Sequence, residues 1–156
     1  MGTIANTPVK KNAVVKISTT DDVSTATEYQ CEIASVGPST PPTVNRSEES
    51  SICGATVSIE DGITGGHNVP FTAFYRDTLA AGQVATPVDL VMIMWDAAEN
   101  RTTLYMWVFQ MGEVADALGW KVVGIPEPMA MPDIPASGAF KFTCNLYGTV
   151  TPIQSA

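Results

Sequence analysis

Residues 88–109 read VDLVMIMWDAAENRTTLYMWVF, and this stretch carries the strongest β-strand pattern in the sequence. Its two halves, Val88–Trp95 and Thr102–Phe109, are rich in β-branched and aromatic residues and flank a short polar segment at 96–101. The pattern predicts an antiparallel hairpin whose strands are apolar on both faces. Because a hairpin in a small domain normally keeps one face in water, the second face needs a helix or another subunit to cover it.

Four further segments alternate apolar and polar residues with the period of two that is typical of strands. They cover residues 13–19, 28–36, 55–60 and 139–147. The last is the clearest, with one apolar and one polar face: Phe140, Phe142, Cys144 and Leu146 against Lys141, Thr143 and Asn145. Together these segments predict a mainly β domain over residues 1–156. We expect two packed antiparallel sheets, sandwich-like or barrel-like, with one flanking α-helix.

Residues 68–81 are the best candidate for that helix. Phe71, Phe74 and Leu79 recur at helical spacing, a capping asparagine and a proline begin the segment, and Gly82 follows it. A strand over 71–75 is the competing interpretation. Residues 112–118 form a second, shorter helix candidate.

Three segments are predicted to be irregular. Residues 1–12 form a polar N-terminal arm. Gly37–Ser51 contains three prolines, which exclude a helix, and a loop of this length usually serves binding or assembly. Ile125–Ser137 is a second proline-rich loop, with four prolines.

Charge is low in amount and unevenly distributed. Only 15% of residues are charged, against about 25% in ordinary soluble proteins, which suggests a surface covered by other subunits. The net charge is −8, divided into +3 over residues 1–20 and −11 over the remainder. A body this acidic repels nucleic acid, so we expect no sequence-specific DNA or RNA binding.

The three cysteines, Cys31, Cys53 and Cys144, form no CxxC pair and lie in or beside predicted strands. We expect them to be free thiols that behave as small apolar residues, which indicates a reducing compartment. No signal-peptide pattern and no apolar run long enough for a membrane span is visible. We therefore expect synthesis in the cytoplasm and no membrane partner.

No residue constellation indicates catalysis, and we predict no catalytic, cofactor or metal site. One histidine and three scattered cysteines cannot form a standard zinc site. His67 has no accompanying nucleophile motif and is expected to be a loop residue before a helix cap. Asp61-Gly62 is interpreted as a turn, and the acid pairs Asp21-Asp22 and Glu48-Glu49 as solvated loops.

Three stretches carry a resemblance to a known family. Ile33–Ser39 through Glu48-Glu49 is similar to a strand that leads into a long acidic loop between rings. Val69–Leu79 occupies the place of a helix. Gly138–Thr143, ending at Gly148–Pro152, looks like a closing strand and a terminal turn. In this order the chain resembles the major tail tube proteins of long-tailed bacteriophages, a family that includes type VI secretion tubes.

The resemblance implies a structural virion protein that self-assembles into stacked hexameric rings. Such a tube would form an acidic channel through which DNA passes without specific binding, and six copies would carry a charge of −48. The implied location is the virion tail, after synthesis in the host cytoplasm. The implied partners are further copies of the chain and other tail proteins, such as tape measure, terminator and distal tail proteins.

Residue patterns and resemblance together suggest an assembly interface. Lys10 and Lys11 are expected to lie against acids of an adjacent subunit, either Asp21-Asp22 or Glu48-Glu49. Trp107 is expected to face outward. The full candidate set is Lys10, Lys11, Pro38, Pro41, Pro42, Glu48, Glu49, Trp95, Tyr105, Trp107 and Phe109.

Two other functions remain open. The chain could be another phage structural part, either a capsid decoration protein or a head–tail connector. It could also be a monomeric β-sandwich or lipocalin-like protein that binds a small ligand, with the methionines and tryptophans of 88–109 lining the cavity.

Overall fold

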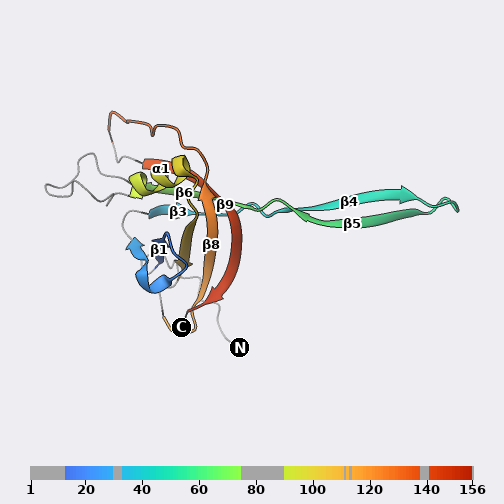
Figure 1. The fold of residues 1–156 in the computed structure, drawn as a ribbon, viewed down its shortest axis with the longest axis horizontal. Coiled ribbons are helices and arrows are strands. Elements are labelled where there is room, and N and C mark those ends of the chain that lie inside the picture. The colour runs from blue at the N-terminus through green and yellow to red at the C-terminus, as the bar shows by residue number, and fades with distance from the viewer. Residues whose placement is uncertain are drawn as a thin grey trace.

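The structure is a computed structural model that describes residues 13–29, 33–74, 90–110, 112, 114–137 and 141–155. The described residues are mainly β with a single α-helix, which confirms the predicted fold class (Figure 1). The elements are β1 (Val14–Ser18), the 3-10 turn η1 (Val23–Thr25), β2 (Thr27–Tyr29), β3 (Ile33–Val36), β4 (Thr43–Ser50), β5 (Thr56–Thr64), β6 (His67–Phe74), α1 (Leu90–Asn100), β7 (Leu104–Phe109), β8 (Leu118–Pro126) and β9 (Lys141–Gln154).

Seven strands form one antiparallel sheet in the order β2-β1-β7-β8-β9-β6-β3, and β4 and β5 form a separate two-stranded sheet. The large sheet is curled, and α1 lies on its concave side (Figure 1). Its two edge strands are β2 and β3, which are only three residues apart in sequence. A link that short spans at most about 14 Å between the Cα atoms of Tyr29 and Ile33, so the sheet must bring its two edges near each other.

The core lies between the inner face of this sheet and α1. In β9 the residues Phe142, Cys144 and Leu146 are buried, whereas the alternate residues between them are exposed. This period of two is the pattern predicted for 139–147, and it is confirmed for the described residues. Cys144 lies 4.0 Å from the sulfur of Met94 on α1, so strand and helix meet in the centre of the core.

The helix predicted for residues 68–81 is wrong over its described part, because His67–Phe74 is strand β6. Val69, Phe71 and Ala73 are all buried and alternate along the strand, which pairs with β9 on one side and β3 on the other. The aromatic spacing that suggested a helix arises because Phe71 faces the core while Phe74 lies on the other face beside Lys141. Residues 75–81 lie outside the described residues.

The strand predicted for Val88–Trp95 is also wrong over its described part, since α1 runs through residues 90–100. Residues 88 and 89 lie outside the described residues. Leu90, Met94, Ala97 and Ala98 are its buried residues, and their spacing of four, seven and eight is one stripe of a helix. The polar segment 96–101 is therefore the last part of a helix and not a hairpin loop. Arg101, at φ 53°, ends the helix, and the strand predicted at 102–109 is confirmed as β7.

The outer face of β7 is covered by the chain itself. Val14, Trp107 and Phe109 form a second small core, against which Val23 and Ala26 of the η1 region pack. The Asp22 side chain caps η1, and its hydrogen bonds from the hydroxyl and the backbone N–H of Ser24 lower the pKa of Asp22. The two-faced apolarity of β7 thus reflects two cores of one chain.

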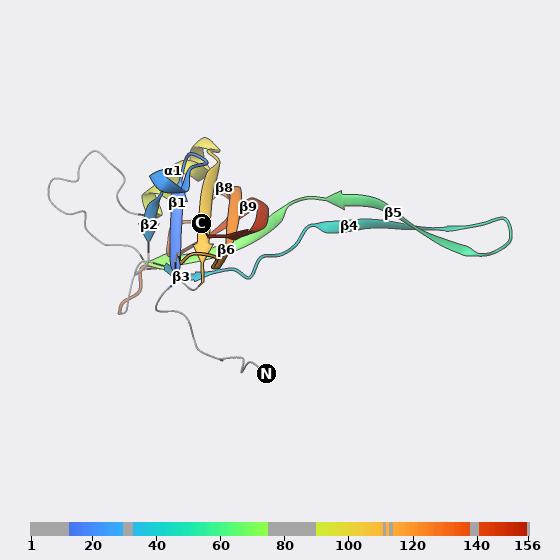
Figure 2. The ribbon, with the colours of Figure 1, turned by 90° about the horizontal axis from the view of Figure 1, so that it is seen from below.

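The loop predicted for Gly37–Ser51 is wrong over its second half. Residues 43–64 form a β-hairpin, here named the ribbon, in which β4 and β5 pair from Thr43–Thr64 to Ser50–Thr56. Asp61-Gly62 is not a turn but lies within β5, at a register shift opposite Asn45 and Arg46. Gly62 has φ 99°, a conformation that favours glycine and suits a bulge. The ribbon projects away from the large sheet in both views (Figures 1 and 2).

Two glycines allow the sheet to curl sharply at its centre. Gly124 of β8 and Gly148 of β9 are paired, and the next strand contributes His67. A Cβ atom on Gly148 would lie 1.9 Å from the carbonyl oxygen of Val123, and one on Gly124 would lie 2.9 Å from that of Tyr147. The backbones approach so closely here that only glycine fits.

The remaining expectations fare unevenly. Among 112 and 114–118, no residue is helical, so the short helix predicted at 112–118 is wrong. Residues 127–137 are irregular as predicted, but Ile125 and Pro126 belong to β8. The terminal turn predicted at 148–152 is instead part of β9, which pairs with β8 as far as Gln154. Ser155 is then held to Ala117 and Asp116 by two backbone hydrogen bonds of 2.8 and 3.0 Å.

Candidate functional site

The ribbon is the most exposed element of the described chain. Arg46 of β4 and Glu60 of β5 form an ion pair of 3.3 Å, with both side chains about two-thirds exposed. Such a pair contributes roughly 0.2–1 kcal/mol, so the ribbon is held mainly by its backbone ladder. The isoleucines of β5, Ile59 and Ile63, are exposed as well. An apolar residue set of this kind on a free hairpin indicates a contact surface.

The tip of the ribbon is an ordered turn over residues 51–55. Ser51 donates its backbone N–H to the carbonyl of Ala55 at 2.8 Å, and Gly54 donates to the carbonyl of Ser51 at 2.9 Å. The Ser51 hydroxyl also accepts the N–H of Ala55 at 3.1 Å. The turn presents Ile52, which is fully exposed, and Cys53. Cys53 was predicted to behave as a small apolar residue, but its side chain is exposed.

A cavity of about 760 Å³ lies on the part of the inner sheet face that α1 does not line. Its floor is apolar, and none of its lining residues comes from α1: the inner-face residues are Val15, Val69, Val108, Trp120, Val122 and Val150. Both edges of the sheet border it, through Tyr29 of β2 and Ile33 of β3. Gly37, Pro38 and Ser39 line it beyond the end of β3.

His67 borders the same cavity as the first residue of β6, not as a loop residue before a helix. Its Nδ1 atom is buried and has no hydrogen-bond partner among the described residues. Gln110, which is exposed, lies on the cavity at the end of β7. The cavity is therefore an apolar surface with few polar groups at its border.

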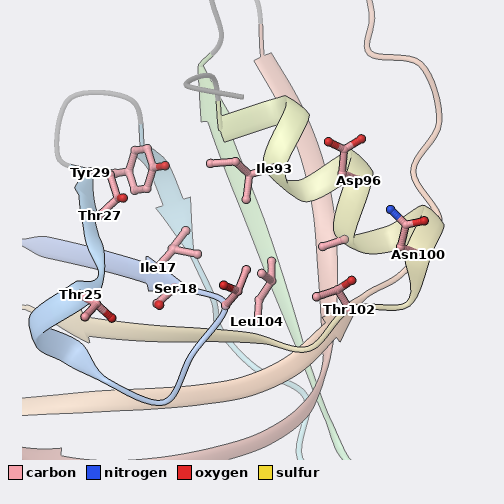
Figure 3. Close-up of a pocket in the computed structure, with 12 residues that line it drawn as sticks. Ile17, Ser18, Thr25, Thr27, Tyr29, Ile93, Asp96, Asn100, Thr102 and Leu104 are labelled. Atoms are coloured by element: carbon pink, nitrogen blue, oxygen red, sulfur yellow. The ribbon is translucent and has the colours of Figure 1, made fainter. Parts of the chain in front are cut away.

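A second, smaller cavity of about 360 Å³ separates α1 from the ends of β1 and β2 (Figure 3). Ile93, Asp96 and Asn100 of α1 face Ile17 and Tyr29 across it. Asp96 is the single ionisable carboxylate among its lining residues. A lone carboxylate without a partner base or nucleophile is no catalytic arrangement.

The outer face of the sheet carries a stacked aromatic pair. The rings of Tyr105 and Trp107 lie 6.4 Å apart at 23°, and the ammonium group of Lys121 lies 5.9 Å from each ring centroid. The same ammonium pairs with Asp21 at 2.5 Å. Asp21, a predicted contact for Lys10 and Lys11, therefore already has a partner within its own chain.

The candidate interface residues separate into distinct places. Trp107 lies on the outer face of the sheet, as predicted, but Trp107 and Phe109 are buried there by their own chain. Tyr105 and Trp95 are half-buried, on β7 and α1. Pro38 borders the large cavity, whereas Pro41 and Pro42 precede the ribbon and Glu48 and Glu49 lie exposed on β4. Lys10 and Lys11 lie outside the described residues.

The predicted residues that the structure brings together are thus those of the ribbon and of the segment leading into it. Sequence reasoning missed Ile52, although an isoleucine directly after a run of polar residues and two residues before Gly54 was a visible signal. It also missed the cavity, whose lining residues become neighbours only through strand register.

Chemistry-bearing groups are sparse. The described residues contain no cluster of three histidine, cysteine or carboxylate side chains that could hold a metal ion. Burial raises the pKa of Cys144 to about 12, so this thiol is unreactive at neutral pH. Within the described chain, no helix has both the length and the apolar character needed to cross a membrane.

Two solved assemblies contain chains with this fold. One is the sheath–tube complex of an extracellular contractile injection system, PVC, in its extended state. The likeness has a TM-score of 0.60 at 12% identity and covers 97% of this chain and 94% of the other. The other is the anti-feeding prophage cap, which terminates the tube. There the TM-score is 0.54 at 10% identity, over 99% and 95% of the two chains. At these identities the likeness shows a shared fold. No family model and no curated protein matches the sequence.

Proposed function

We propose that the chain is a self-assembling structural subunit of the tube of a phage-tail-like particle. The observation that carries this proposal is the end-to-end likeness of fold, which includes nearly all of both chains. The solved chains belong to the sheath–tube complex of an extracellular contractile injection system and to the tube-terminating cap of an anti-feeding prophage. We favour a tube protein over an enzyme, because the two cavities of the described chain contain no catalytic arrangement of side chains.

The ribbon supports the same function. A two-stranded hairpin is only marginally stable by itself, yet this one extends from the sheet with exposed isoleucines and exposed acids. A long edge with free backbone groups is a hazard unless another chain covers it. We therefore propose that the ribbon contacts neighbouring subunits. This agrees with the resemblance of residues 33–49 to a segment that lies between rings.

The finer assignment is a stack of hexameric rings with an acidic channel. Its support is the net charge of −8 per chain, which would make a ring of six copies strongly anionic and would keep DNA from adhering to the wall. The proposed partners are further copies of the chain together with the other components of the tail, and the proposed location is the assembled particle.

Electron microscopy of the purified protein tests this function. Tubes or six-fold rings are expected, at protein concentrations that favour association. A terminating cap would give isolated rings that never stack, and a monomer at every concentration would contradict the proposal. Size-exclusion chromatography with light scattering on the same sample gives the mass of the species.

A second function, binding of a small apolar ligand, is favoured by the cavity of about 760 Å³, a size within the usual range for ligand sites. It predicts a stable monomer whose melting temperature rises with an apolar ligand. The exposed ribbon has no role in that function, so we favour the structural subunit.

A further inference from the structure

We propose that the ribbon tip of one copy of the chain inserts Ile52 into the large cavity of a second copy. This inference deepens the proposed function, because it rests on self-assembly and names the two surfaces that meet. The occupant of the cavity is a second molecule of the same chain, and the contact is between two different surfaces of it.

The first reason is the state of the tip. Ile52 is fully exposed at the end of a turn held by backbone hydrogen bonds, so the isoleucine is presented in a fixed position. Exposed large apolar residues on an ordered projection mark interaction sites. An anchor that is already ordered loses little conformational freedom on docking.

The second reason is reach. The cavity border at Ser39 lies four residues before β4, at the root of the ribbon. β4 has eight residues, which as an extended strand measure about 26 Å. The ribbon is paired along this whole length and points away from the sheet (Figure 2). The tip therefore cannot fold back into the cavity of its own chain, and the recipient must be another copy.

The third reason is chemical fit. The cavity is lined by valines and by the apolar rings of Trp120 and Tyr29, and its volume exceeds that of one isoleucine side chain several times. The tip offers Ile52 with the neighbouring Cys53 and Ala55, a small apolar group without charge. Carboxylates begin only at Glu49, three residues from Ile52, so they stay outside an apolar cavity.

The fourth reason is charge. With Ile52 in the cavity, Glu49 and Glu48 lie about 10–13 Å back along the strand. The residues that line the cavity include no aspartate or glutamate, so no like charge within it opposes the approach of these two acids.

The described part of each chain carries one ribbon tip and one large cavity of this kind. Every copy can therefore insert its tip into one neighbour and receive the tip of another. Such head-to-tail contacts generate closed rings or open stacks, according to the rotation between copies. The docking thus gives the proposed tube a specific joint.

Cross-linking tests the proposal on the full-length chain. In a Cys31→Ser background, Cys53 is the native thiol left beside the buried Cys144. Introducing Ser39→Cys or Gln110→Cys at the cavity border should give disulfide-linked dimers and ladders under mild oxidation, since docking brings the Cα atoms near the 4.4–6.8 Å that a disulfide needs. Thr151→Cys is the control, because it is exposed on the opposite face of the sheet and should not cross-link.

Substitutions supply the second readout. Ile52→Asp changes an exposed residue, so it should fold normally but raise the concentration needed for assembly by roughly ten- to a hundredfold. Ile52→Val should assemble almost as the natural chain does. Ala34→Trp, an exposed position on the cavity, should block assembly in the same way as Ile52→Asp.

Each outcome decides between the claims. If the natural chain forms tubes, Ile52→Asp forms them equally well and no border position cross-links, the docking is wrong and the tube function stands. If Ile52→Asp fails to assemble without any border cross-link, the tip docks elsewhere and the cavity assignment is wrong. A natural chain that stays monomeric overturns both.

Discussion

The hydroxyl of Tyr147, on β9, accepts a hydrogen bond of 2.7 Å from the backbone N–H of Gly66, which lies between β5 and β6. Strand β9 of the large sheet therefore holds the root of the ribbon. A Cβ atom on Gly66 would lie 2.7 Å from the carbonyl oxygen of Gly148, so the two segments are in close contact at this point.

Removing that hydroxyl tests its contribution. Tyr147→Phe should lower the free energy of unfolding by about 0.5–1.5 kcal/mol, the usual net value of one hydrogen bond. Urea denaturation measures this change. The neighbouring exposed position gives a matched control, since Thr149→Val should change stability by less than about 0.5 kcal/mol. Equal stability of Tyr147→Phe and the natural chain would contradict the anchoring role.

Gly148→Ala should be far more damaging. Its Cβ would lie 1.9 Å from a backbone oxygen of β8, which cannot move without breaking the ladder between β8 and β9. We expect a loss of about 3 kcal/mol or more, or no soluble protein. Thr149→Ala on the same strand controls for strand propensity. A Gly148→Ala protein with an unchanged denaturation midpoint would show that the sheet is looser here than described.

Replacing the ribbon separates folding from assembly. Substituting residues 43–64 with a short glycine–serine loop leaves the Thr40–Asn68 bridge, whose two backbone hydrogen bonds of 2.8 and 3.1 Å close the chain at the root. The body should fold with a melting temperature within a few degrees of the natural chain and should not form tubes. Full-length tubes from this variant would exclude the ribbon as a stacking element.

Trp107→Asp should disrupt folding and not assembly alone. Trp107 is 5% exposed and packs with Val14 and Phe109 under the η1 segment. Loss of the ring and burial of a charge should cost about 3–5 kcal/mol, so the variant should be largely unfolded by circular dichroism. Met92→Asp is the control, because Met92 is 45% exposed on α1. If the Trp107→Asp chain folds and fails only to assemble, Trp107 belongs to the contact between subunits.

The lysines of the arm give a salt-dependent prediction. Lys10→Glu combined with Lys11→Glu should slow assembly, and most clearly at low salt, because exposed charge pairs are screened within about 10 Å at 0.1 M salt. Light scattering of assembly at two salt concentrations measures the effect. Lys141→Glu is a control charge reversal on an exposed residue of β9. An unchanged rate at low salt would mean that charge on the arm does not guide assembly.

The sequence predicted the fold class because several strands alternate cleanly, β9 above all. The prediction assigned a helix to residues 68–81 and a strand to residues 88–95, whereas the described parts of these segments are strand β6 and helix α1. The second of these errors has a physical reason. The run from Leu90 to Trp95 is apolar at every position, and a run like that fits a buried helix or a buried strand equally well. Ala97 and Ala98, which favour a helix, were interpreted as part of a loop.

The ribbon and the cavity were harder to predict. β4 reads TVNRSEES and buries no residue, so its sequence shows no alternation of apolar and polar residues. Its strand conformation comes from pairing with β5. The cavity is lined by residues of all seven strands of the large sheet, and only the strand register defines which of their side chains face inward. Glu48 and Glu49 are exposed, as predicted, but they lie on strand β4 and not in an irregular loop.

The position of β9 determines how this chain can fold. Among the described strands it is the last in sequence, and it lies between β8 and β6, so it alone joins the four strands β2-β1-β7-β8 to the pair β6-β3. Before β9 inserts, both halves present unpaired strand edges that are prone to aggregate. Pairings this distant in sequence form slowly, so we expect the insertion of β9 to be a late step of folding. In the proposed assembly, a subunit would therefore be able to polymerise only after this strand has been incorporated.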